Sequence, residues 1–196
     1  MMLLVSSSRE AYHHGRLAQA LEDAAMQLLE RKPATEISLR EVARAADVSH
    51  NAPYHHFTDR RGLLKALAER SMRELLAGVR DAVGGARAAG GPVDALLAGG
   101  SAYIRFAVEH PNAFTAVYDP TVCIPGAPTE TMAPLIEELE TILGSTAAAV
   151  GLGSESDALA LWGLMHGLGT LCAAGHFPAA AAQAAFAAGA TRMLPN

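Results

Sequence analysis

Apolar residues recur at helical spacing over one long stretch of the chain, and this stretch limits the possible folds more than any other feature. The residues that keep the spacing are Leu63, Leu64, Leu67, Ala68, Met72, Leu75, Leu76, Val79 and Val83. The run predicts an amphipathic helix that begins at Asp59, a residue able to cap it, and ends at Gly84 and Gly85. A helix of this length can connect two parts of a molecule mechanically.

Alanine and leucine dominate the chain, in which 51% of residues are hydrophobic and only 5% are aromatic. This composition favours helices that pack closely through small side chains. We therefore expect an all-α protein of about nine helices. Apart from the long helix, the expected helices cover residues 16–31, 38–46, 49–55, 92–110, 111–118, 132–143 or beyond, 154–174 and 178–193, with an irregular loop at 119–128.

Two short helices joined by a tight turn precede the long helix. Ser38 and Glu41 match a capping box, in which each side chain satisfies a free amide at a helix start. Asp47 tolerates the left-handed conformation that a tight turn needs, and Ser49 can cap the next helix. Such a pair of helices is typical of a helix-turn-helix unit that places its second helix in the DNA major groove, although compact helical domains of other kinds also show the pattern.

The stretch from YHHGRL at Tyr12 through SLREVARAADVSHNAPYHHFTDRRGLLKAL, which ends at Leu67, closely resembles the N-terminal domain of the tetracycline-repressor (TetR) family. The W-x-x-x-H-G motif of Trp162 to Gly167 resembles one C-terminal subtype of that family. The chain departs from the family pattern at Asp47, where glycine is common, at Arg60, where lysine is common, and at Gly62. The resemblance implies an arm (1–15), a three-helix helix-turn-helix DNA-binding domain (16–75) and a C-terminal helical ligand-binding and dimerisation domain (76–196).

Candidate DNA contacts lie in and around the second helix of the helix-turn-helix unit. The amide of Asn51 has the geometry for two hydrogen bonds to adenine, and arginines near the next helix start can grip phosphate. We expect DNA contacts from Ser38, Arg40, Ser49, His50, Asn51, Tyr54, His55, His56, Arg60 and Arg61. The resemblance adds Arg16 or the arm of Tyr12, His13 and His14. As alternatives, Tyr54 and Phe57 belong to the core, and Arg40 pairs with Glu36 or Glu41.

Charge is unevenly divided between the two parts of the chain. The net charge is -5 overall, made up of +1 for residues 1–75 and -6 for residues 76–196. Five of the eight histidines also lie in the first part. An acidic C-terminal part repels DNA and so orients the molecule on it, which is compatible with DNA binding by the first part.

The C-terminal part carries a stripe of small residues and a set of aromatic residues. Small residues allow close helix approach, and dimerisation across a two-fold axis suits a palindromic operator, so we expect an interface at Gly163, Gly167, Thr170, Ala174 and Phe186. An effector pocket needs aromatic walls and a few polar groups. Its candidates are Tyr103, Phe106, His110, Phe114, Tyr118, Met132, Trp162, Met165 and His166. Ordinary intramolecular packing is the alternative for both sets.

Other classes of protein fit the sequence less well. Cys123 and Cys172 form no disulfide framework, and the opening MMLLVSSS lacks the basic region of a signal peptide, so we expect a cytoplasmic protein. Residues 158–175 are apolar enough to suggest a membrane-spanning helix, but His166 lies at their centre and favours a buried helix. The pairs His13-His14 and His55-His56 lack the spacing of metal ligands, and no nucleophile motif is present. We expect no metal, no cofactor and no membrane partner.

The function that we expect is a sequence-specific transcription regulator, not an enzyme. It binds double-stranded DNA at a palindromic operator as a homodimer, and we expect a repressor that a small-molecule effector releases. Three alternatives stay open: a TetR-like DNA binder without a ligand, such as a nucleoid-associated protein; an activator; and a small helical enzyme.

Overall fold

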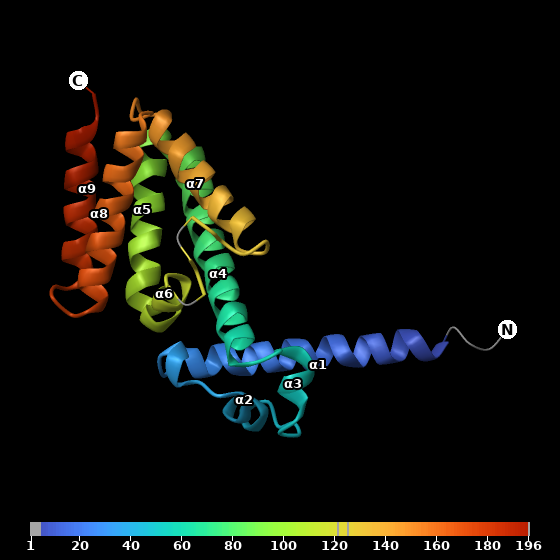
Figure 1. Ribbon diagram of the computed structural model, residues 1–196. Coiled ribbons are helices and arrows are strands. Elements are labelled where there is room, and N and C mark those ends of the chain that lie inside the picture. The colour runs from blue at the N-terminus through green and yellow to red at the C-terminus, as the bar shows by residue number, and fades with distance from the viewer. Residues whose placement is uncertain (1–4, 121, 125, 196) are drawn as a thin grey trace.

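The structure is a computed structural model that describes residues 5–120, 122–124 and 126–195, with side chains from residue 16 onward. Within these residues the chain is all-helical, as expected, with nine α-helices, one 3₁₀ helix and no strand (Figure 1). The helices are α1 Val5–Leu29, η1 Ala34–Glu36, α2 Leu39–Ala45, α3 Ala52–His56, α4 Arg60–Ala89, α5 Pro92–Glu109, α6 Pro111–Val117, α7 Ala133–Ala148, α8 Glu155–Ala173 and α9 Ala179–Met193.

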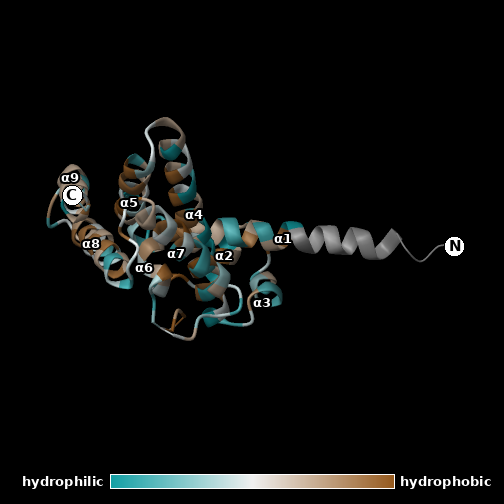
Figure 2. Cartoon of the chain, turned by 90° about the horizontal axis from the view of Figure 1, so that it is seen from above, coloured by the Kyte–Doolittle hydropathy of each residue, from teal (hydrophilic) through white to brown (hydrophobic). Residues whose placement is uncertain are grey.

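The helices form two units joined by α4. In the first unit, α1 lies across the start of α4, with α2 and α3 beneath it (Figure 1). In the second unit, α5 contacts α4, α6, α7, α8 and α9, so it is the central helix. Seen from above, α8 and α9 lie on the left and the described part of α1 on the right, with α4 and α5 between them (Figure 2). The long helix therefore connects the helix-turn-helix unit to a helical bundle, as the sequence predicts.

The ends of α2 and α4 are fixed by the predicted caps. Ser38 Oγ accepts a hydrogen bond from the Glu41 backbone N–H at 3.3 Å, and Glu41 Oε2 accepts one from the Ser38 N–H at 3.0 Å. Lys32 Nζ lies 2.7 Å from the other carboxylate oxygen of Glu41. At the start of α4, the Asp59 side chain accepts a hydrogen bond from the Gly62 N–H at 2.8 Å. Local side-chain chemistry thus sets where both helices begin.

The predicted end of the long helix at Gly84 and Gly85 is wrong, because α4 continues to Ala89. A glycine inside a helix costs only about 1 kcal/mol relative to alanine, and packing can offset this. Val83 lies directly against Gly99 of α5, where an added Cβ would meet it at 2.8 Å. The helix ends instead before Gly91, whose φ of 100° favours glycine.

The predicted start of the first helix also differs from the structure. The helix α1 begins at Val5 rather than near residue 16, and it ends at Leu29 rather than at Arg31. Residues 5–16 contain one glycine and no proline, so the sequence offers little to stop the helix there. The side chains of Tyr12, His13 and His14, the expected arm contacts, lie outside the described residues.

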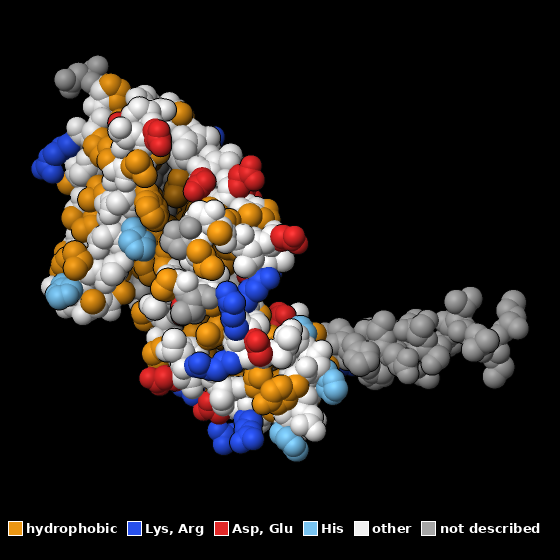
Figure 3. Space-filling view, viewed as in Figure 1, with side chains coloured by type: hydrophobic (Ala, Val, Ile, Leu, Met, Phe, Trp, Pro, Cys, Tyr) orange, Lys and Arg blue, Asp and Glu red, His pale blue; other side chains and the backbone are white. Residues whose placement is uncertain are grey.

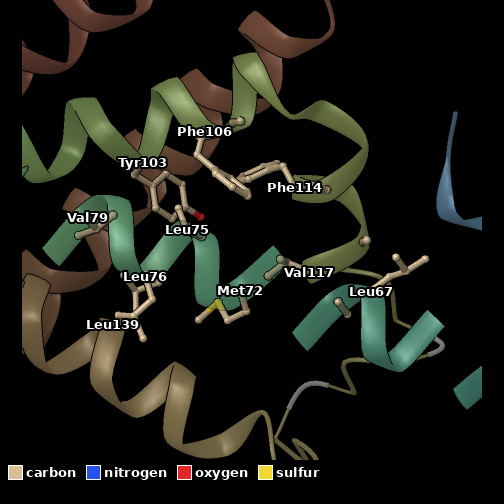
Figure 4. Packing of buried hydrophobic residues seen from close by; sticks show 14 of the residues in the cluster. Leu67, Met72, Leu75, Leu76, Val79, Tyr103, Phe106, Phe114, Val117 and Leu139 are labelled. Atoms are coloured by element: carbon tan, nitrogen blue, oxygen red, sulfur yellow. The ribbon is translucent and has the colours of Figure 1, made fainter. Parts of the chain in front are cut away.

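The core of the second unit depends on close helix contacts with α5. Phe186 of α9 is fully buried, and its ring lies over Gly100, where an added Cβ would come within 2.0 Å of the ring. On another side of α5, Tyr103 lies beside Leu75 of α4, and Leu139 of α7 lies beside Leu76 of α4 (Figure 4). Because the helices approach so closely, the core tolerates little change in side-chain volume at these points.

In the described residues, none of the helices has both the length and the apolar character that crossing a membrane requires. This holds for α8, which contains most of the apolar stretch at residues 158–175.

Replacing Gly100 with alanine is expected to destabilise the protein by about 1–3 kcal/mol, because the new methyl group collides with the Phe186 ring. Gly84→Ala is the matched control: nothing lies within 4 Å of its added Cβ, and the change is expected to stabilise α4 by roughly 0.5–1 kcal/mol. Chemical denaturation monitored by circular dichroism measures both. Equal stability of the two variants would contradict the described α5–α9 packing.

Glu41 is expected to make the first unit less stable at acid pH. The hydrogen bond from Lys32, followed by those from Ser38, lowers the pKa of Glu41 from 4.5 to about 2. Because the folded pKa is the lower one, the stabilisation is complete above about pH 4.5 and is lost as the pH falls through about 2. Thermal unfolding between pH 5 and 2 should therefore be less pH-dependent in Glu41→Gln. The control is Glu36→Gln, at an exposed carboxylate; if both variants keep the wild-type profile, the capping network is not as described.

Candidate DNA-binding surface and effector site

The turn between α2 and α3 has the predicted geometry. Asp47 has a φ of 53°, the only positive φ among the described non-glycine residues, and the Val48 N–H donates to the Ala43 carbonyl at 3.0 Å. The expectation that Ser49 caps α3 is wrong. The helix begins at Ala52, and Ser49 contributes only its backbone carbonyl, which accepts from the Ala52 N–H at 2.9 Å. Pro53 occupies the first turn of α3, where its missing N–H costs little.

The residues at the start of α3 form an exposed polar surface. Ser49, His50 and Asn51 are exposed, and none of their side chains caps α3. Tyr54 is 53% exposed whereas Phe57 is only 3% exposed, so Phe57 belongs to the core and Tyr54 does not. Lysine, arginine and histidine side chains gather at this end of the molecule, and carboxylates are prominent on the visible face of the second unit (Figure 3).

The expected phosphate-binding residues differ in their present partners. Arg60 donates to the Thr35 carbonyl, and His56 Nε2 lies 3.0 Å from Glu22 Oε1 on α1. Arg40 and Arg61 are exposed and have no ion-pair partner among the described residues. The alternative pairing of Arg40 with Glu41 is not formed, because Glu41 pairs with Lys32.

The two remaining candidate DNA contacts are Ser38 and His55. The hydroxyl of Ser38 is held in the capping box. His55 is exposed on α3. The candidate DNA-binding surface therefore has exposed polar groups just before and within α3 and exposed arginines on α2 and α4.

Aromatic residues from three helices meet inside the second unit. The hydroxyl of Tyr103 on α5 lies 2.5 Å from the Tyr118 hydroxyl and 3.1 Å from His166 Nδ1 on α8. Phe114 of α6 packs edge-on against Tyr103 with ring centroids 5.6 Å apart. The ring centroids of Trp162 and His166 lie 5.6 Å apart with the rings tilted by 41°, and Trp162 is 44% exposed, so this aromatic cluster reaches the surface at α8. Five predicted pocket residues thus come together.

Burial shapes the chemistry of the aromatic cluster. It lowers the pKa of His166, which is therefore a neutral imidazole at pH 7. Burial also raises the pKa values of Tyr103 and Tyr118, so both stay protonated. The hydroxyl-to-imidazole chain is neutral, and it offers hydrogen bonds within an aromatic setting.

The other predicted pocket residues are dispersed. Phe106 is buried and packs on His110 at 5.3 Å. His110 is exposed and lines a groove of about 520 Å³ at the junction of α1, α4 and α6, which corrects its assignment to the aromatic pocket. Met132 and Met165 are buried in the core of the second unit. The prediction placed His110 with Phe106 because they share a helix face, but Pro111 turns the chain towards the first unit at that point.

Side chains that the sequence analysis missed hold the two units together. Asn112 at the start of α6 donates to the Leu29 carbonyl at the end of α1, at 2.9 Å. Arg70 Nη1 on α4 lies 2.6 Å from Asp23 Oδ1 on α1. A hydrogen bond from Arg70 lowers the pKa of Asp23. No sequence signal marks these pairs, because their partners are 47 or more positions apart in the chain.

The outer face of α8 is apolar and carries most of the predicted interface residues. Thr170 and Ala174 are exposed, and nothing lies within 4 Å of a Cβ added at Gly163 or Gly167. Leu159 and Leu171 on this helix are also exposed. Phe186 is a correction: it is 0% exposed and packs on α5, so it cannot contact a second copy directly.

The described residues contain no group of three histidine, cysteine or acidic side chains placed to hold a metal ion. Cys123 and Cys172 are both free thiols.

Comparisons with known proteins agree with this architecture. Residues 21–67 match the family model for bacterial regulatory proteins of the tetR family, and residues 96–194 match the tetracyclin repressor-like C-terminal domain. No curated protein matches the chain with significance.

Solved structures share the whole fold. A protein of unknown function from Rhodococcus sp. RHA1 is 31% identical, with a TM-score of 0.76 over 94% of this chain and 98% of that one. A tetR-family transcriptional regulator from Streptomyces coelicolor is 19% identical, with a TM-score of 0.69 over 91% and 80%. The TetR-like regulator LfrR from Mycobacterium smegmatis, in complex with proflavine, is 20% identical, with a TM-score of 0.60 over 93% and 98%.

With an exposed helix-turn-helix unit, a helical second unit and a family match that covers both, the chain belongs to the TetR family and is a DNA-binding transcription regulator.

Proposed function

We propose that the chain is a dimeric repressor that binds a palindromic operator and leaves it when a small apolar or aromatic effector occupies the second unit. The observation that carries this proposal is the continuity of α4. It begins next to the recognition surface at Arg60, and its buried residues pack beside Tyr103 of the aromatic cluster (Figure 4). A change in the packing around Tyr103 therefore has a direct route to the orientation of α3.

Sequence recognition is assigned to the exposed start of α3. Asn51 supplies paired hydrogen bonds to an adenine, while Ser49, His50, Tyr54 and His55 contact neighbouring bases or phosphates. Arg40 and Arg61 contact phosphates. Arg60 and His56 join them only by exchanging their present partners, Thr35 and Glu22, for phosphate oxygens.

Dimerisation is assigned to the outer face of α8 together with α9, which contacts it. A stable soluble protein rarely leaves such an apolar face uncovered, and a second copy related by a two-fold axis would cover it. This arrangement also presents two recognition helices to one side of DNA.

The effector site is assigned to the aromatic cluster. Its neutral imidazole and hydroxyls suit an uncharged aromatic compound with a hydrogen-bonding group. The proflavine complex of LfrR shows a small molecule bound to a protein of this fold, which supports the assignment. Release then follows from linkage, because an effector that prefers one arrangement of α4 must bind less tightly when DNA holds the other.

The alternatives make different demands. An activator or a nucleoid-associated DNA binder would use the same recognition surface as a repressor. The activator would differ from a repressor in its response to the effector, and the nucleoid-associated protein in its sequence specificity. An enzyme would have to keep its turnover when Asn51→Ala and Arg61→Ala together abolish DNA binding. The two free thiols suit work in a reducing cytoplasm.

Asn51→Ala is expected to weaken binding to a duplex selected from random DNA by about 1–3 kcal/mol and to relax specificity at one base pair. Arg61→Ala should weaken binding to selected and unselected DNA alike and reduce the salt dependence, because it removes a phosphate contact. Arg105→Ala, at an exposed arginine of α5, is the control. Fluorescence anisotropy measures all three, and an Asn51→Ala variant with wild-type affinity and specificity would refute the assignment of α3.

Leu171→Glu is expected to convert a dimer into monomers, because it places a charge in the apolar face of α8. Val93→Glu is the matched control, since Val93 is 40% exposed and Leu171 46% exposed, but Val93 lies at the start of α5. Sedimentation velocity at micromolar concentration gives the oligomeric state. Dimers that persist in Leu171→Glu would place the interface elsewhere.

Trp162, the single tryptophan of the chain, provides a direct reporter of effector binding. Screening small aromatic compounds by its fluorescence should identify ligands whose affinity falls when the selected duplex is present. Tyr103→Phe, which removes one hydroxyl from the cluster, should weaken these ligands and leave DNA affinity unchanged. Ligands that bind equally well with and without DNA would contradict release by linkage.

A further inference from the structure

Glu69 on α4 is a buried carboxylate in a helix whose buried face is otherwise almost entirely apolar. The residue is only 8% exposed. Its Oε1 accepts hydrogen bonds from the hydroxyls of Thr131 and Thr129, the latter at 3.3 Å. These threonines stand directly before α7, about sixty positions further along the chain. A single acidic side chain of α4 therefore holds the start of α7.

The charge of Glu69 is balanced within α4 itself. Lys65 Nζ lies 3.6 Å from Oε1, and Arg73 Nη2 lies 3.8 Å from Oε2, each one turn away. Both cations belong to α4, so neither of these contacts involves a residue of α7. The threonine hydroxyls supply the close hydrogen bonds that a buried carboxylate needs, so their loss would leave it poorly satisfied.

The threonines also organise the chain around them. The Thr129 carbonyl accepts from the Met132 and Ala133 backbone N–H groups at 3.0 and 2.9 Å, and its hydroxyl accepts from the Met132 N–H at 3.2 Å. Met132 itself is buried. Holding Thr129 on Glu69 therefore fixes the first turn of α7, which runs beside α4 (Figure 1).

Glu69 and its neighbour Arg70 attach α4 to different parts of the molecule. Glu69 binds the start of α7 in the second unit, and Arg70 pairs with Asp23 of α1 in the first unit. Two adjacent residues of α4 thus each carry a polar attachment, one to the second unit and one to the first.

We propose that Glu69, Thr129 and Thr131 form a latch that fixes the start of α7 on α4 and thereby positions the helix-turn-helix unit for DNA binding. Glu69 is a positioning residue in this scheme and does not touch DNA. With the latch open, the joint between the units has more freedom, and this freedom must be given up on the operator, so affinity falls. The structural part of the proposal is independent of the proposed function, and only its effect on DNA rests on it.

Hydrogen–deuterium exchange of the full-length protein tests the latch without DNA. Glu69→Gln should speed amide exchange in residues 129–136 and leave that of α8 and α9 unchanged. The variant Thr129→Val with Thr131→Val, which keeps the Glu69 charge, should give the same increase, and all three changes together should add nothing further. The control is Glu138→Gln, which breaks an exposed ion pair between α7 and Arg80. Wild-type exchange in the threonine variant, or an equal increase in the control, would overturn the latch.

The effect on DNA is measured with the same variants on the selected duplex. Loss of one or two hydrogen bonds is expected to weaken operator affinity by about two- to tenfold. The salt dependence should not change, because no phosphate contact is lost. If the variants show faster amide exchange but bind the duplex with wild-type affinity, the proposed coupling to the helix-turn-helix unit is overturned, whereas the contact between Glu69 and the start of α7 is supported. If the wild-type protein selects no duplex, the proposed function fails. The hydrogen–deuterium exchange result still tests whether Glu69 and the threonines form the latch.

Discussion

The packing of α4 against α5 is the interaction on which the rest of the structure depends. The helix has 30 residues and is about 45 Å long, and its buried face is shared between the two units. Val83 packs closely on Gly99 of α5 directly before Gly84 and Gly85, and α4 continues through both glycines. Because one helix contributes to both cores, a shift of α4 in the second unit changes the position of the first.

An apolar core that is continuous across α4 joins the two units, and the side-chain hydrogen bonds and ion pairs that supplement it are few. Asn112 caps the end of α1, Arg70 pairs with Asp23, and Glu69 holds the start of α7. Hydrogen bonds and partly exposed ion pairs each contribute only about 1 kcal/mol, so exchanging one of these polar contacts for another costs little free energy. A regulator needs this property, since a ligand shifts the balance only between states that lie close in free energy.

Local chemistry made part of the fold predictable. The cap residues Ser38 and Asp59 and the turn residue Asp47 act within a few positions of themselves, and the sequence alone indicates their roles. The end of α4 and the burial of Phe186 depend instead on what α5 places opposite them, which periodicity does not reveal. His110 shows the same limit, because a helix break one residue later separates it from the aromatic cluster.

The candidate sites likewise include some features that local sequence predicts and others that depend on contacts between distant residues. The exposed residues around α3 follow from the helix-turn-helix spacing. Helical spacing grouped Trp162 with His166, but it also placed His110 with Tyr103, so only part of the aromatic cluster was predictable. The polar contacts that join the units were missed, because each depends on two residues that are distant in sequence. Glu69 in particular lies among charged neighbours that predict only a solvated helix face.

Selection of duplexes from random DNA by the purified protein, followed by sequencing at two salt concentrations, tests the central claim most directly. A dimeric regulator that reads bases through α3 should enrich a two-fold symmetric site and lose affinity steeply as salt rises. Enrichment of no sequence by a folded protein would contradict the account and leave the second unit as the place to look for its function.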